Sequence, residues 1–268
     1  MIIKNRFMKK LYFLLAALFI VVAACHHDPE KPEPTPEPKD GDIIKNAATD
    51  YDGNTYDAVR IGLQIWLAEN LRTTHTPDGK YLPVSDMQDG KVPSRSYPGG
   101  DSSNVEIYGY LYNWPGIMNG ELASESNPSG VQGICPQGWH IPSDAEFTQL
   151  TDYVSSQSQF WCSDSSTIAK ALCATREWVR NDIHCAAGYR IATNNATGFG
   201  ALPGGSRFFS TYHHVGILSY FWTTTEYEIS QEHRELNAYM RYIYVDDSTV
   251  TRLANIKAGI GGLRCLKD

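Results

Sequence analysis

The sequence predicts an α+β domain in which the helix signals lie early and most of the strand signals follow them. The strongest helix signal is Ser143 followed by Glu146, because a serine and a glutamate at this spacing form a capping box. Apolar residues then recur at spacings of three and four, which places one apolar stripe against a core. The strand signals are runs of branched and aromatic residues between turn formers. These observations define the fold class.

The first 24 residues have the three parts of a secretory signal peptide: a basic start, an apolar run over residues 11–22, and small residues before Cys25. The apolar run is too short to cross a membrane comfortably. The segment resembles the lipobox of bacterial lipoproteins, in which the cysteine is acylated and becomes the first residue. We therefore expect Cys25 to be a lipid anchor, since several acyl chains on one residue bind a membrane firmly. The alternative is an ordinary cleaved signal in which Cys25 has no role.

Residues 25–42 predict a spacer between this anchor and the folded chain. Proline alternates with acidic residues over residues 29–38, and such a run favours an extended, self-repelling chain. We see no second boundary after it, so residues 43–268 are expected to form one domain. The protein is thus expected in the bacterial cell envelope, bound by its lipid to a membrane, most simply the outer membrane.

Composition and motifs exclude several classes of function. The 268 residues include 30 acidic and 23 basic residues, a formal net charge of -7. Nucleic acid is therefore not an expected partner, because phosphate binding needs a basic surface. The sequence contains no nucleophile elbow, no His-Glu-x-x-His and no phosphate-binding glycine loop, so we assign no catalytic residue and no cofactor. A carboxylate pair for glycoside hydrolysis stays open, because separation in space is invisible in sequence.

In chain order, the first expected strands cover residues 54–61 and 64–68, joined through Gly62. Residues 73–104 are rich in Pro, Gly, Ser and Asp and are expected to form a long loop. Residues 108–114 then return to a strand-like aromatic pattern.

Two helices and four more strands complete the expected set. The first helix begins after Ser143 and carries Phe147, Leu150 and Val154 on one face, and the second covers residues 167–174. The later strands are expected at residues 220–225, 239–245, 250–253 and 263–266.

Two groups of possible metal ligands do not meet the spacing that metals require. Residues 50–54 contain two aspartates and a glycine, but a calcium loop has its glycine at the sixth position, and here it is the fourth of the motif. His213 and His214 have no third ligand at a recognisable spacing. We therefore expect no metal site.

Five ordered blocks are similar to the Fibrobacter succinogenes major paralogous domain family: residues 52–56, 65–71, 135–146, 195–199 and 263–265. Parts of the third and last blocks also resemble formylglycine-generating enzymes, which have a C-type-lectin-like fold. This resemblance implies two helices beside a twisted antiparallel sheet, with long loops. It does not imply the activity, because those enzymes use two closely spaced cysteines near the chain end and only Cys265 lies there. The sugar-binding motif of calcium-dependent lectins is not intact either.

Two arguments predict the state of the cysteines. In lectin-like folds a cysteine near the first helix pairs with one in the last strand, so the resemblance implies a disulfide between Cys135 and Cys265. Export would expose the five cysteines after Cys25 to an oxidising compartment, and five cannot all pair. A bridge between Cys162 and Cys185 would flank the second helix, which leaves Cys173 as the free thiol. The alternative is that all five are reduced and packed as apolar residues.

The expected ligand site is the segment that contains Arg207, Tyr212, His213 and His214. Aromatic faces stack on sugars, and arginine and histidine donate hydrogen bonds to hydroxyl groups. The competing interpretation is that the neighbouring phenylalanines, Phe208 and Phe209, are core residues. We therefore predict a surface or periplasm-facing lipoprotein that acts as a binding or adhesion module, for a glycan or an envelope protein. The alternatives are an enzyme acting on envelope or extracellular polysaccharide, and a purely structural envelope protein.

Overall fold

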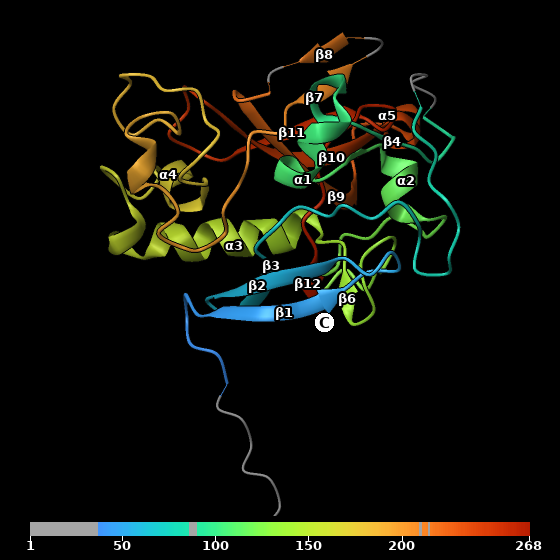
Figure 1. The fold of residues 1–268 in the computed structure, drawn as a ribbon, viewed down its shortest axis with the longest axis horizontal. Coiled ribbons are helices and arrows are strands. Elements are labelled where there is room, and N and C mark those ends of the chain that lie inside the picture. The colour runs from blue at the N-terminus through green and yellow to red at the C-terminus, as the bar shows by residue number, and fades with distance from the viewer. Residues whose placement is uncertain (1–36, 86–89, 209–210, 214) are drawn as a thin grey trace, which may run out of the picture. The chain divides into compact units, whose positions relative to one another are not determined.

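The computed structural model describes residues 37–268, apart from residues 86–89, 209, 210 and 214 (Figure 1). The expected signal peptide, Cys25 and most of the expected tether lie outside the described residues. Residues 38–268 form a single structural unit. A search of the described helices finds none with the length and apolar character needed to cross a membrane.

The first sheet has five strands in the order β1-β2-β3-β12-β6. Strands β1 (Ile43–Thr49), β2 (Thr55–Ile61) and β3 (Gln64–Leu67) form an antiparallel meander, as predicted for the last two. The last strand, β12 (Leu266–Lys267), pairs with β3 on one side and with β6 (Trp139–His140) on the other. The end of the unit therefore lies beside its beginning, and β12 is shorter than the strand predicted there.

The second sheet has three antiparallel strands in the order β11-β10-β9. They are β9 (Leu218–Glu226), β10 (Asn237–Tyr244) and β11 (Thr251–Ile256), so the three strands predicted here are confirmed with shifted ends. Two short two-stranded antiparallel sheets complete the described strands: β4 (Arg95–Ser96) with β5 (Leu111–Tyr112), and the hairpin of β7 (Ser206–Phe208) with β8 (Thr211–His213).

The long helix α3 (Asp144–Ser156) lies between the two main sheets (Figure 1). Its predicted capping box is present: Ser143 Oγ accepts from the backbone N–H of Glu146, whose carboxylate accepts from the backbone N–H of Ser143. The apolar face packs Phe147 against Trp66 of β3, with ring centroids 4.8 Å apart, and against Phe221 of β9. The helix therefore joins the two sheets through one aromatic cluster, which confirms the predicted helix and its buried face.

The second predicted helix is only one turn long, α4 (Ala169–Leu172). Its start is delayed because Thr167 Oγ1 accepts hydrogen bonds from the backbone of a preceding turn, at Ser163 and Asp164. Its end comes early because Cys173 has extended backbone and bridges to Ala201. The prediction of a helix over residues 167–174 was therefore too long.

Residues 108–114 are not one strand, which corrects the prediction. Helix α1 (Val105–Tyr108) ends at Gly109, whose φ of 73° suits glycine, and α2 (Trp114–Met118) starts where Asn113 caps the N–H of Gly116. Only β5 between them is extended. The other described helices are α5 (Gln231–Leu236) and the 3-10 turns Pro98–Gly100, Ser102–Asn104, Ser158–Phe160 and Ile191–Thr193.

The fold class is α+β, as predicted. Within the described ranges, α3 is the only helix longer than six residues, where the resemblance implied two. Both expected disulfide pairings are present, Cys135 with Cys265 and Cys162 with Cys185, and Cys173 is a buried free thiol.

A buried histidine connects the first sheet to α3. His140 of β6 lies 2.8 Å from a carboxylate oxygen of Glu146 through Nε2 and 2.7 Å from one of Asp268 through Nδ1. Burial alone would lower the pKa of His140, but the hydrogen bonds and charges of these two carboxylates outweigh it and raise the pKa. The charged imidazolium is thus the form that this arrangement stabilises.

We expect this group to make stability depend on pH. Because the folded pKa of His140 lies above its unfolded value, its stabilising contribution is complete below the unfolded pKa and is lost as the pH rises through the folded pKa. His140→Gln should therefore be less stable than wild type in mildly acidic buffer, with the difference shrinking towards alkaline pH. Urea titrations at a series of pH values give the free energies of unfolding. A constant difference at every pH would contradict the assignment.

Candidate functional site

The predicted ligand segment forms the β7–β8 hairpin, but its arginine faces inward. Arg207 is 1% exposed and donates a 2.6 Å hydrogen bond to the backbone oxygen of Ser85. Its guanidinium carbon lies 5.1 Å from the ring centroid of Tyr212, so these two predicted residues are neighbours. Arg207 therefore holds the hairpin against the preceding loop and is not a surface donor for a ligand. This burial depends on a contact 122 residues away in sequence, which the local pattern could not show.

Tyr212 is half-buried, with its hydroxyl 3.3 Å from Ser96 Oγ. The side chain of His213 and the whole of His214 lie outside the described residues. Their expected role in ligand binding stays a prediction.

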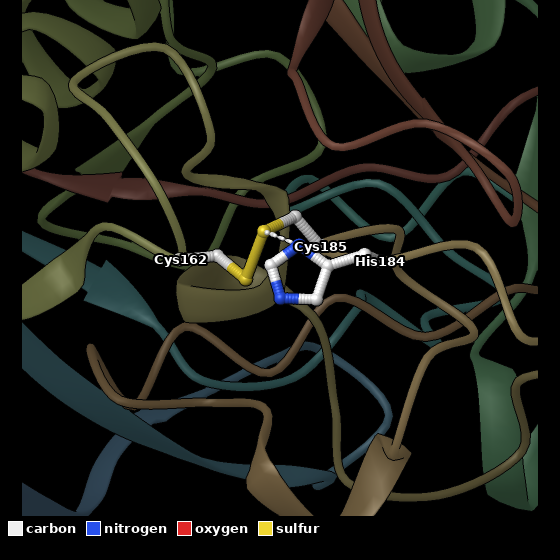
Figure 2. Close-up of side chains that lie close together, drawn as sticks. All are labelled: Cys162, His184 and Cys185. Atoms are coloured by element: carbon white, nitrogen blue, oxygen red, sulfur yellow. Dashed lines mark hydrogen bonds between the residues drawn. A yellow bond between two sulfur atoms is a disulfide. The ribbon is translucent and has the colours of Figure 1, made fainter.

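Cys162, His184 and Cys185 bring three possible metal-ligand atoms within 4.8 Å of one another (Figure 2). The two sulfur atoms share a disulfide, and His184 Nδ1 lies 3.1 Å from the sulfur of Cys185. Zinc binds cysteine as the thiolate, and a disulfide supplies none. In this oxidised state His184 is the one good metal ligand of the cluster. The disulfide closes the loop between the two cysteines.

The free thiol is chemically protected. Cys173 follows α4, is fully buried, and its pKa is raised by that burial, with a smaller opposing effect of Lys170. Reaction of a cysteine requires the thiolate, so this residue behaves as a small apolar side chain.

An open groove lies on the second sheet beside α5. It encloses about 560 Å³, and we call it the aromatic groove; its lining consists of Tyr227, His233, Asn237, Tyr239, Arg252, Leu253 and Ala254. The rings of Tyr227 and Tyr239 are perpendicular, with centroids 5.4 Å apart, and the His233 ring lies 6.1 Å from Tyr227. The groove thus offers aromatic rings, an amide and a guanidinium on one surface.

The local sequence explains why these groups meet. Ser230 caps α5 by accepting from the N–H of His233, and the chain turns directly from α5 into β10 at Asn237. Asn237 and Tyr239 are two residues apart on β10, so they share one face, and Ala254 of β11 is directly opposite Tyr239. The sequence interpretation missed this site because it identified neither α5 nor the return of the chain; Ser230 was the available signal.

The arginine of the aromatic groove is fixed by the N-terminus of α3. Arg252 Nε donates to a carboxylate oxygen of Asp144 at 2.7 Å, and its guanidinium carbon lies 3.6 Å from the centroid of Tyr239. Arg241 pairs with the same carboxylate at 2.7 Å. Arg252 is therefore held against a ring while about half of its side chain stays exposed.

A second hollow, of about 390 Å³, is lined by residues from two of the family-like blocks, 65–71 and 195–199, and by their neighbours. We call it the signature cleft. Two ion pairs lie in it, Lys45 with Asp57 and Arg72 with Glu69, each with an N···O distance of 2.7 Å. The hydrogen bond from Lys45 is the largest cause of the lowered pKa of Asp57. A general acid needs a raised pKa, so Asp57 is unsuited to donate a proton at neutral pH.

Comparison with known proteins identifies a family. The model described as the Fibrobacter succinogenes major domain matches residues 59–267. No curated protein and no solved structure gives a significant match to the chain.

Proposed function

The chain belongs to the Fibrobacter succinogenes major domain family, and we propose that it is a surface or periplasm-facing lipoprotein whose domain binds saccharide chains in the aromatic groove. In this proposal Cys25 carries the lipid, residues 25–42 hold the domain away from the outer membrane, and the domain is a variant of the C-type-lectin-like fold. The basic, apolar and small-residue pattern before Cys25 supports the anchor. The antiparallel sheets and the pairing of Cys135 with Cys265 are compatible with the fold.

The observation that carries the proposal is the composition of the aromatic groove. The apolar faces of sugar rings stack on aromatic side chains, and their hydroxyl groups need donors and acceptors at the edges of those rings. Tyr227 and Tyr239 supply the rings, while Arg252 and Asn237 supply polar groups beside them. Arg252 is already held by Asp144, so binding loses little side-chain entropy at this position.

The carboxylates of the two hollows favour a binding module over a glycoside hydrolase. Glycoside hydrolysis requires two carboxyl groups across the scissile bond, one of them a proton donor. Among the described residues, the groove lining contains no carboxylate, and the carboxylates of Asp57 and Glu69 in the signature cleft are engaged by Lys45 and Arg72. We therefore place the envelope or extracellular polysaccharide enzyme second to a binding module.

We expect the double variant Tyr227→Ala/Tyr239→Ala to lose saccharide binding. A sugar face that buries about 60 Å² of ring surface gains about 1.5 kcal/mol, so each ring lost should weaken binding about tenfold. A panel of neutral oligosaccharides is screened with the mature chain carrying Cys25→Ser, which removes only the acylation site. Affinities of the hits are then measured by calorimetry.

The matched control is Tyr51→Ala, because Tyr51 is a 60% exposed tyrosine on the turn between β1 and β2. It should bind as wild type. Unchanged affinity in a folded double variant, or no neutral oligosaccharide bound by wild type, would refute the aromatic groove as the site.

A further inference from the structure

A third hollow lies beside the Cys162–Cys185 disulfide and is dominated by basic side chains. It encloses about 620 Å³, and we call it the cationic pocket; its lining is Arg180, Asn181, Asp182, Tyr189, Arg190, Ile191 and Ala192. Arg180 and Arg190 are both exposed, and neither guanidinium forms an ion pair or a hydrogen bond with any described residue. Asp182 is the only acidic residue of the lining, in a chain whose formal net charge is -7. Two unpaired arginines therefore face one cavity in an otherwise acidic protein.

A buried lysine adds a third positive charge next to Tyr189 of the cationic pocket. Lys170 of α4 is 8% exposed, and its ammonium group donates to the backbone oxygen of Tyr189 and to Asn194 Oδ1. Both partners are neutral, so no described carboxylate neutralises Lys170. Burial lowers its pKa, and an anion bound in the cationic pocket would oppose that shift. The three cations here, Arg180, Arg190 and Lys170, thus outnumber Asp182, the one carboxylate of the described lining.

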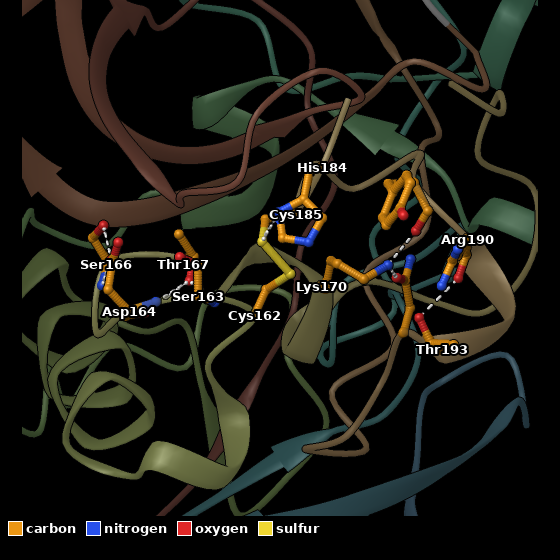
Figure 3. The surroundings of a disulfide bond; sticks show 12 residues. Cys162, Ser163, Asp164, Ser166, Thr167, Lys170, His184, Cys185, Arg190 and Thr193 are labelled. Carbon is orange, nitrogen blue, oxygen red and sulfur yellow. Dashed lines mark hydrogen bonds between the residues drawn. A yellow bond between two sulfur atoms is a disulfide. The ribbon is translucent and has the colours of Figure 1, made fainter. Parts of the chain in front are cut away.

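One aromatic ring lies among these cations. Tyr189 is half-buried, with the guanidinium carbon of Arg190 5.2 Å and the Lys170 nitrogen 5.7 Å from its centroid. The ring of His184 lies 5.4 Å away on another side. Figure 3 shows Lys170, His184 and Arg190 around the disulfide. A ring beside a guanidinium and an ammonium group suits a ligand that has both a sugar face and an anionic group.

The walls of the cationic pocket are fixed before any ligand binds. The disulfide closes a loop of 23 residues, and Asn181 Nδ2 donates to the backbone oxygen of Val245 at 2.9 Å. Gly188 packs so closely that an added Cβ would lie 2.4 Å from the backbone oxygen of Val179. A rigid pocket reduces the entropy lost on binding.

We infer that the cationic pocket binds the carboxylate of an acidic saccharide, with Arg180 and Arg190 as its partners and Tyr189 as the stacking surface. Arginine presents two parallel N–H donors that match the two oxygens of a carboxylate. The saccharide part of this inference rests on the proposed function, whereas the cationic pocket and its charge stand independently of the aromatic groove. An acidic glycan is thus assigned to a second site on the same domain.

The test compares oligogalacturonate with its fully methyl-esterified form, using the mature chain with Cys25→Ser. The ester keeps the sugar rings and removes the negative charge, so its affinity should be at least tenfold lower. Arg180→Ala/Arg190→Ala should weaken oligogalacturonate binding about thirtyfold, because the charge-assisted hydrogen bonds from both guanidinium groups to the carboxylate are lost. Arg180→Lys/Arg190→Lys should fall between, since lysine retains the charge without the paired donors.

The control for lost charge is Arg176→Ala/Arg234→Ala, which removes two exposed arginines outside the cationic pocket. Equal affinity for the ester, or wild-type affinity in the Arg180→Ala/Arg190→Ala variant, would overturn the inference, as would no binding of oligogalacturonate at all. Retention of oligogalacturonate binding by Tyr227→Ala/Tyr239→Ala would support it. If neutral saccharides bind in the aromatic groove but oligogalacturonate does not bind in the cationic pocket, the proposed function stands and this inference is wrong. If oligogalacturonate binds in the cationic pocket but neutral saccharides do not bind in the aromatic groove, only the groove is refuted.

Discussion

Replacing both Cys135 and Cys265 with alanine is expected to lower the free energy of unfolding by about 5 kcal/mol. The bridge closes a sequence separation of 130 residues, and the chain-entropy model assigns about that value to a loop of this length. Both residues are fully buried in the core that joins β3, β12 and the segment before β6, so the cross-link also fixes where the last strand enters the first sheet. The total free energy of unfolding of a typical domain is about 5 to 15 kcal/mol, so this loss would be a large part of it.

The matched control is Cys162→Ala/Cys185→Ala, which opens a loop of only 23 residues. The same model assigns about 3.5 kcal/mol to that bridge, so the two double variants should differ by more than 1 kcal/mol. Guanidinium titrations of the wild type and both variants measure the difference. An equal loss, or a larger loss from the short loop, would contradict the account in which loop length decides the effect.

The parts of the fold that sequence predicts are those encoded by neighbours in the chain. Helix α3 is the clearest case, because its cap at Ser143 and its apolar stripe lie within 14 residues. The β2–β3 hairpin is another, since Gly62 provides the left-handed turn, with φ of 60°. The predicted range of α4 was too long because the limits of the helix are set by Thr167 and by the bridge between Cys173 and Ala201, which no local sequence pattern shows.

The two candidate sites lie outside the segment that the sequence indicates, for the same reason. The aromatic groove draws on α5, β10, β11 and the residue after β9, and beside the cationic pocket a lysine of α4 donates to the backbone oxygen of Tyr189. Composition pointed instead to the segment around Arg207, which is rich in aromatic and basic residues but turns its arginine into the protein. A local concentration of suitable residue types does not determine which of them reach the surface.

The family-like blocks lie mainly in the scaffold of the domain and not in either proposed site. Cys135 and Cys265 come from two blocks and form the long disulfide, while Ser143 and Glu146 form the capping box of α3. The aromatic groove is lined by residues between 227 and 254 and the cationic pocket by residues between 180 and 192, and both ranges fall between the blocks. A shared frame with different side chains in these two regions would let members of the family bind different ligands.

Arg264, in the last family-like block, joins the block at residues 65–71 to the block at residues 195–199, and its loss is expected to destabilise the fold at least as much as loss of the short disulfide. It is fully buried, and its guanidinium donates to the backbone oxygens of Leu67 and Phe199 and twice to Asn70 Oδ1, at 2.8 and 3.2 Å. A further 3.4 Å contact reaches the backbone oxygen of Gly200. One side chain thus joins residues 65–71 to the loop that follows Asn195, behind the signature cleft.

Burial lowers the pKa of Arg264 to about 9, which still leaves the group charged at neutral pH. Burying this cation costs desolvation free energy, because its described hydrogen-bond partners are all neutral oxygens. Its contribution must come from satisfying these oxygens and from the Phe199 ring, whose centroid lies 4.5 Å from the guanidinium carbon.

Arg264→Leu should lower the free energy of unfolding by about 4 kcal/mol or more, because each buried oxygen left without a donor costs about 1 to 3 kcal/mol. Arg264→Lys, which retains the charge and fewer donors, should lose less and remain folded for measurement. Arg176→Leu is the control, since its side chain is 57% exposed and its ion pair with Glu177 is 3.8 Å long; its change should stay within about 0.5 kcal/mol. Urea titration gives all three values. If Arg264→Leu and Arg176→Leu changed stability equally, the neutral oxygens around Arg264 would have to be satisfied by water that enters the core, and the guanidinium would not be what joins the family-like blocks.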